Sequence, residues 1–175
     1  MKNIVIYHKA DFDGIFCCEI ARKFLPDAEL IGWDYGDPVP DVPKDAQLYM
    51  LDISVADLMD HPNLIWIDHH KSAMEKYDLS LPKSDFEAVC VTGPLAARAA
   101  LPPTNKQLAQ DRIILGYRID GVAACRLAWQ WFTHHFKLPE KDDFVERRVS
   151  EPLAVLLAGE YDVWDHRPCD MLIGL

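Results

Sequence analysis

The chain has 175 residues, a formal net charge of −10 and a pI near 5.0, and half of its residues are hydrophobic. This length suits one domain with a substantial core. The acidic balance disfavours broad binding to duplex nucleic acid, because phosphate backbones repel a negative surface. The N-terminal apolar run is too short for a signal peptide or a membrane span. The five cysteines are odd in number and include no C-x-x-C pair, which favours reduced, buried thiols and a cytoplasmic protein.

The first half of the chain alternates predicted strands with helices and loops. A polar turn at residues 9–14 leads into a helix pattern that starts at Ile15 and is closed by Pro26. Ser54 and Asp57 resemble a capping box that opens a short helix. This alternation predicts an α/β fold with a mainly parallel sheet flanked by helices. The predicted strands, each a short apolar run, are residues 3–8, 30–33, 48–51 and 64–67.

The second half gives weaker patterns. A strand is expected at residues 86–91 and a short helix at 96–101. A last helix near residues 151–159 leads to Asp162, and residues 1–175 are expected to form a single domain. A stronger helix is expected from Gly121, with Asp120 as its N-cap. The side chains that recur at helical spacing along it, and are predicted to be core, are Val122, Cys125, Trp129, Phe132 and Phe136.

Acidic and histidine residues stand where three of the predicted strands end. His8 is followed by Asp11 and Asp13, Asp52 follows the third strand, and residues 68–70 (DHH) follow the fourth. The C-terminal ends of parallel strands share one edge of a sheet, and ligands bind there. Packed carboxylates repel one another, so protons or cations must neutralise them. The mixture of imidazole and carboxylate without thiolate favours manganese, magnesium or iron over structural zinc.

Each of these motifs alone also has an ordinary structural interpretation. The DFDG run at residues 11–14 is typical of a solvated turn, and Asp52 could help to cap a helix. Two adjacent histidines more often lie at the surface or pack against other side chains than bind a metal ion. Their order and their common position at strand ends favour a metal site. Four further histidines have no such placement and are expected to be structural or solvent-facing: His61, His134, His135 and His166.

Four motifs in this order resemble the DHH phosphoesterase superfamily, which takes its name from the triplet present at residues 68–70. The residues that carry the resemblance are IYHKADFDG at 6–14, LDIS at 51–54, WIDHHKS at 66–72 and YDVW at 161–164. Residues 121–129 (GVAACRLAW) also look like a helix of the nanoRNase-like branch. The resemblance implies a parallel-sheet domain that uses two metal ions, usually Mn²⁺, with Mg²⁺ or Fe²⁺ as alternatives.

The resemblance also implies roles for individual residues. Asp52 would bridge the two ions, Asp68 would orient the ligands, and His70 would face the substrate phosphate. The ions would activate water for attack on phosphorus and stabilise the developing charge. Members of the family usually carry a second, C-terminal substrate-binding domain; in this chain it is expected to be absent or truncated, as in a fragment. The implied metal ligands are His8, Asp11, Asp13, Asp52, His69 and Asp162.

The leading expectation is an enzyme that hydrolyses phosphodiester bonds of short oligonucleotides, which suit an acidic protein better than a long duplex does. Hydrolysis of a cyclic dinucleotide, pyrophosphate or polyphosphate is an alternative within the same chemistry. A non-catalytic metal-binding module that lacks its substrate lid is another alternative, and a purely structural domain would bind no metal. Neither a membrane nor duplex nucleic acid is expected as a partner.

Overall fold

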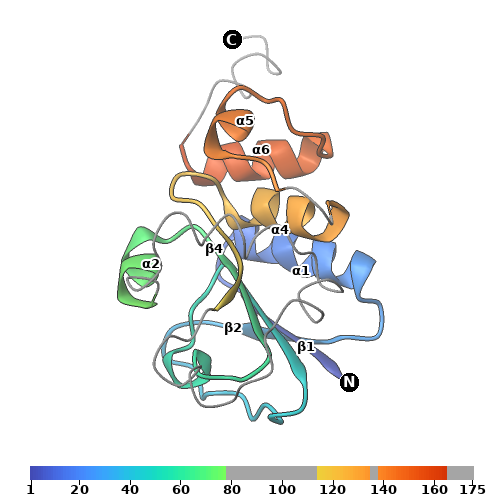
Figure 1. The fold of residues 1–175 in the computed structure, drawn as a ribbon, viewed down its shortest axis with the longest axis vertical. Helices are drawn as coiled ribbons and strands as arrows, with labels where there is room; N and C mark the ends of the chain where they lie inside the picture. The colour runs from blue at the N-terminus through green and yellow to red at the C-terminus, as the bar shows by residue number, and fades with distance from the viewer. Residues whose placement is uncertain (78–113, 135–137, 165–175) are drawn as a thin grey trace, which may run out of the picture.

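The computed structural model describes residues 1–77, 114–134 and 138–164, and its centre is a five-stranded parallel sheet (Figure 1). The strand order is β2-β1-β3-β4-β5, and every neighbouring pair is parallel. The predicted α/β fold is therefore confirmed, and β5 is an additional strand that was not predicted. The strands are β1 (Asn3–His8), β2 (Glu29–Trp33), β3 (Gln47–Leu51), β4 (Leu64–Asp68) and β5 (Leu115–Arg118).

Helices flank this sheet. α1 contacts β1, α4 contacts β4 and β5, the two helices pack against each other, and α6 packs on both (Figure 1). None of the helices described is both long and apolar enough to cross a lipid bilayer. The helices are α1 (Phe12–Phe24), the 3₁₀ helix η1 (Ala56–Leu58), α2 (Lys71–Tyr77), α4 (Ala124–Thr133), α5 (Lys141–Val145) and α6 (Leu153–Asp162).

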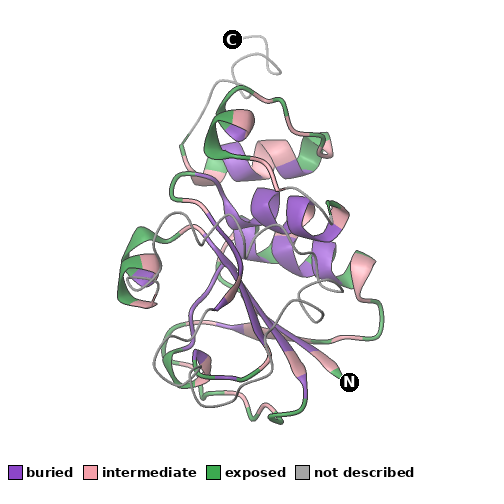
Figure 2. Cartoon of the chain, in the orientation of Figure 1, coloured by how far each residue is buried: buried purple, intermediate pink, exposed green. Residues whose placement is uncertain are grey.

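Side chains of the central strands alternate between two hydrophobic cores, one on each face of the sheet. On β3, Tyr49 and Leu51 join the core formed with α1 and α4, whereas Leu48 and Met50 join the core formed with the segment after β3 and with α2. Figure 2 shows the central strands and the helix surfaces that face them as buried. Burial on both faces explains why these strands read as continuous apolar runs in the sequence.

The predicted start of the first helix was wrong. We expected a turn up to Gly14, but α1 already begins at Phe12, with Asp11 as its N-cap. Asp11 Oδ1 accepts a hydrogen bond of 2.9 Å from the Gly14 amide. The DFDG run is thus the first turn of the helix, because a capping carboxylate satisfies an amide that the helix cannot pair itself.

Two predicted caps were also wrong. Val55, not Ser54, is the N-cap of η1, and no side chain caps that helix. α4 has Ala123 as its N-cap, not Asp120. Its first amides are bonded instead by Asp13 of α1, whose carboxylate accepts from the Ala124 and Cys125 amides at 2.8 Å each.

The remaining differences concern element boundaries. α6 starts and ends later than the predicted 151–159 and includes Asp162 as its last residue. α2 and α5 were not predicted, because each is short. The expected strand at 86–91, the expected helix at 96–101 and the expected core residue Phe136 lie outside the described residues.

Gly14 allows α1 to begin directly beside the end of β1. A Cβ atom at this position would lie 1.8 Å from the backbone oxygen of His8. Because that oxygen belongs to the backbone, a side chain cannot be accommodated by rotating a neighbour. The glycine therefore holds Asp11 and Asp13 close to the end of β1.

We expect Gly14→Ala to lower the free energy of unfolding by roughly 2 kcal/mol or more, as overpacking against fixed backbone does. Chemical denaturation measures this change. Gly32→Ala is the matched control, because a Cβ there first meets the Tyr7 hydroxyl at 3.0 Å, and that side chain can move. Equal losses for the two variants would contradict the role given to Gly14.

Candidate metal centre

The ends of three strands and of two helices bring the six predicted metal ligands together. His8 ends β1, Asp52 follows β3, and His69 follows β4. Ligand atoms that lie within 4.8 Å of one another form three overlapping sets, each able to hold a metal ion. The sets are His8–Asp11–Asp52, Asp13–His69–Asp162 and Asp52–His69–His70.

The first set is centred on the His8 imidazole. His8 Nδ1 lies 2.6 Å from Asp11 Oδ2 and 3.6 Å from Asp52 Oδ2. The other ring nitrogen, Nε2, lies 3.3 Å from Asp34 Oδ1. Because Asp34 engages Nε2, the nitrogen presented to the two carboxylates is Nδ1, and a partner of this kind fixes the orientation of a ligating histidine.

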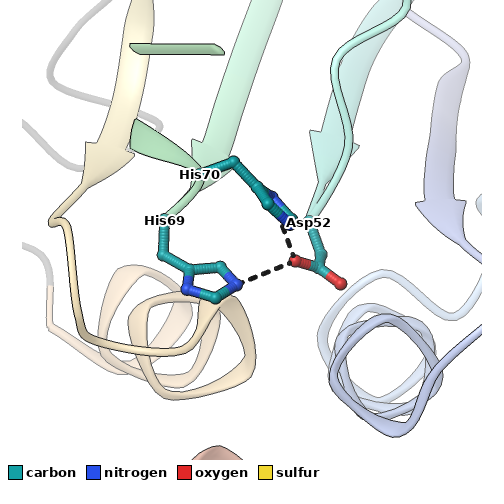
Figure 3. Close-up of side chains that lie close together, drawn as sticks. All are labelled: Asp52, His69 and His70. Carbon is teal, nitrogen blue, oxygen red and sulfur yellow. Dashed lines mark ion pairs between the residues drawn. The ribbon is translucent and has the colours of Figure 1, made fainter. Parts of the chain in front are cut away.

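The second set is centred on His69. Its Nε2 lies 3.3 Å from Asp162 Oδ2, 3.4 Å from Asp52 Oδ1 and 3.6 Å from Asp13 Oδ2. Figure 3 shows His69 and His70 both directed at Asp52. Asp52 therefore stands between the two sets, with Oδ2 near His8 and Oδ1 near His69.

The Asp52 carboxylate has the properties of a metal ligand. Its side chain is only 1% exposed, and neither oxygen has a hydrogen-bond partner in the described part of the chain. A buried charge with unfilled lone pairs is costly unless a cation compensates it. Its backbone is in the left-handed region (φ 59°), which aspartate tolerates better than most residues and which is often found at functional sites. The residues present thus fit a divalent cation.

Asp13 is held from the opposite side by α4. Both of its oxygens accept amide hydrogen bonds at the N-terminus of that helix, where the helix dipole favours a negative charge. Burial, together with the charges of Asp52 and Asp162, nevertheless raises the pKa of Asp13 to about 8. Each carboxylate oxygen keeps a second lone pair that a metal ion could use.

Asp68 makes no contribution to the three sets, because its oxygens are already used. Oδ1 accepts hydrogen bonds from the His69 and His70 amides and lies 2.7 Å from His70 Nδ1, while Oδ2 accepts from Trp66 Nε1. This contact raises the pKa of His70. The His70 side chain is 43% exposed, so the ring is anchored at Nδ1 and stands at the surface of the site.

Without a cation, the carboxylates favour the protonated, positively charged forms of the neighbouring histidines. The nearby Asp52 carboxylate raises the pKa of His8 to about 9. Burial alone would lower the pKa of His69, but Asp52 and Asp13 outweigh it and raise that pKa to about 9. Burial alone would raise the pKa of Asp52, but the two imidazoles hold it at about 2. A cation that binds here must replace these protons.

One residue of the site was missed by the sequence analysis. Asp34, which contacts His8, was not named as a candidate, although it follows a predicted strand directly, as Asp52 does. Its position after β2 was the signal that could have identified it. His61 and His134 lie outside the three sets, as expected: the His61 ring is buried beside the Pro43 carbonyl, and His134 is exposed. His135 and His166 lie outside the described residues.

Comparisons with known proteins address the fold alone. No family model matches the chain, and no curated protein matches it. A solved structure of an uncharacterized protein from Helicobacter pylori G27 is similar in fold, with a TM-score of 0.52 and 13% sequence identity. The match covers 94% of this chain and 44% of that chain, so this chain spans less than half the length of that protein.

The proton content of the cluster predicts how metal binding depends on pH. The pKa values of about 9 for His8 and His69 and of about 8 for Asp13 mean that all three side chains hold protons at neutral pH, which a metal ion must displace. We expect the affinity for Mn²⁺ to rise with pH up to about pH 9, by about tenfold per pH unit for each displaced proton. Isothermal titration in buffers of different ionisation enthalpy measures both the affinity and the protons released. An affinity independent of pH, with no proton release, would contradict this account.

Proposed function

We propose that this protein is a metal-dependent phosphoesterase of the DHH type, which hydrolyses phosphodiester bonds of short oligonucleotides and uses two divalent ions, Mn²⁺ in the first instance. The observation that carries the proposal is Asp52: a buried carboxylate with no hydrogen-bond partner in the described residues, with one oxygen facing each of two imidazoles. A carboxylate in this position is suited to bridging two cations. The order of the four motifs in the sequence supports the same family.

Two adjacent cations in a site of this kind supply charge stabilisation and water activation for phosphoryl displacement. The chain's own residues hold and orient them. His8 and Asp11 would hold one ion, Asp13, His69 and Asp162 the other, and Asp52 both.

The neighbouring DHH residues have a different task. Asp68 fixes the His70 ring through Nδ1, which leaves Nε2 able to donate a hydrogen bond to a substrate phosphate. The raised pKa of His70 favours this donor form of the ring. We therefore assign His70 and Asp68 to substrate binding and orientation rather than to metal binding.

A short substrate in the cytoplasm suits the remaining observations. The formal charge of −10 opposes binding of a long polyanion, whereas the few phosphates of a short oligonucleotide can be held at the metal centre. The three cysteines described, Cys17, Cys18 and Cys125, are buried free thiols, which supports the proposed reducing compartment.

A substrate panel tests the proposed activity. Short RNA, cyclic dinucleotides, pyrophosphate and polyphosphate are each incubated with the protein and Mn²⁺, and products are separated by chromatography. We expect nucleotide release from short RNA that stops when a chelator is added. Turnover of pyrophosphate alone would overturn the choice of substrate. Inactivity on every phosphoester despite bound metal would support the metal-binding module instead.

Asp52→Asn tests the bridging carboxylate. Asparagine keeps the size and tolerates the same left-handed backbone, but a neutral amide cannot compensate two cations. We expect a loss of about a hundredfold or more in Mn²⁺ affinity and no measurable turnover. Asp57→Asn, on the exposed surface of η1, is the matched control and should match the wild type. Near-normal turnover of Asp52→Asn would refute the bridge.

A further inference from the structure

A cavity of about 340 Å³ opens beside the candidate metal centre. Residues from the β1–α1 turn, from α1 and from the end of α6 line it. Two of them, Asp11 and Asp162, belong to different ligand sets of the metal centre. The cavity volume lies in the range typical of small-molecule sites, so a ligand that contacts the metal centre could extend directly into this space.

Two aromatic side chains on the cavity wall are exposed. Phe12 is 67% and Tyr161 is 55% exposed, and they come from α1 and α6 respectively. Phe12 stands between the predicted ligands Asp11 and Asp13, and Tyr161 immediately precedes Asp162. Each aromatic residue is therefore a chain neighbour of a predicted metal ligand and lines the same cavity as that ligand.

We propose that this cavity binds a nucleobase, stacked on Phe12 or Tyr161, of a nucleotide whose phosphate lies at the metal centre. The inference rests on the proposed function, and it names the part of the substrate that the metal centre itself does not recognise. Base–aromatic stacking is tolerant of sequence, because every base has a π-face. It therefore suits an enzyme that acts on short oligonucleotides of any sequence.

The chemistry of the wall favours a base over an inorganic chain of phosphates. Phe12, Ile15 and Tyr161 offer apolar contact area, which a pyrophosphate or polyphosphate cannot use. Lys9 is the one cationic residue among those that line the cavity, and its ammonium group is already paired with Asp37. A polyanion would need several free cationic groups here, so among the alternative substrates those that contain a base fit the cavity best.

The test compares adenosine 5′-monophosphate with ribose 5-phosphate, two probes that share a phosphate and differ in the base. Isothermal titration into the Mn²⁺-loaded protein should give an affinity at least about fivefold higher for the nucleotide, the gain that stacking of one base provides. At least one of Phe12→Ala and Tyr161→Ala, the one that removes the stacking ring, should reduce this ratio towards one. Leu153→Ala, an exposed apolar position on α6 that is not part of the cavity wall, is the matched control and should keep it.

Equal affinities of the wild type for the two probes would overturn the inference, and so would a ratio that neither aromatic substitution changes. A second comparison, of adenosine with ribose, follows the ring protons of Phe12 and Tyr161 by NMR and needs no metal ion. Shifts with adenosine alone would support the base site even if no phosphoester were hydrolysed. Hydrolysis of short RNA without any preference for the base would leave the proposed function standing and refute the base site.

Discussion

Mutual repulsion among carboxylates at one edge of a parallel sheet is the constraint on which this site depends. Asp13 and Asp52 are almost fully buried there, and Asp11 and Asp162 stand beside them. In the metal-free protein, imidazolium groups and a proton on Asp13 limit the charge, as the raised pKa values of His8, His69 and Asp13 require. Divalent cations would do the same with more charge at each position, and they would also give the Asp52 oxygens the direct partners that no hydrogen bond in the described chain supplies.

Two of these carboxylates also cap the helices that pack on the sheet. Asp13 caps α4 while it faces His69, and Asp11 caps α1 while it faces His8. The packing of the helices and the geometry of the site therefore depend on the same two side chains. Each carboxylate accepts hydrogen bonds from helix amides and keeps an oxygen or a lone pair with which it can contact a histidine or a metal ion. This shared use explains why α1 must begin so close to β1, and why position 14 has no room for a side chain.

The sequence allowed the sheet and the convergence of the site to be predicted for a simple reason. Strands buried on both faces read as apolar runs, and parallel strands deliver their C-terminal residues to one edge. β5 was missed because a four-residue strand that contains Gly116 and ends in Arg118 has no such run. The cap of α4 was missed because its partner is non-local: Asp13 is separated from the helix that it caps by most of the chain. Asp34 was missed because a loop rich in proline follows it.

Asp52 links this physical account to the proposed chemistry. Two oxygens on one carbon atom would hold two cations close together, as in two-metal sites that stabilise both the attacking and the leaving oxygen of an in-line displacement. In the proposed site, Asp52 would set the spacing of the two ions, because its carboxylate stands between His8 and His69. Asp52 has a left-handed backbone directly after β3, and its buried oxygens face imidazoles that could ligate the same ions. A metal centre that recognised any phosphate would leave the choice of substrate to its neighbours, and in the proposed base site that task would fall to Phe12 and Tyr161, next to Asp11 and Asp162.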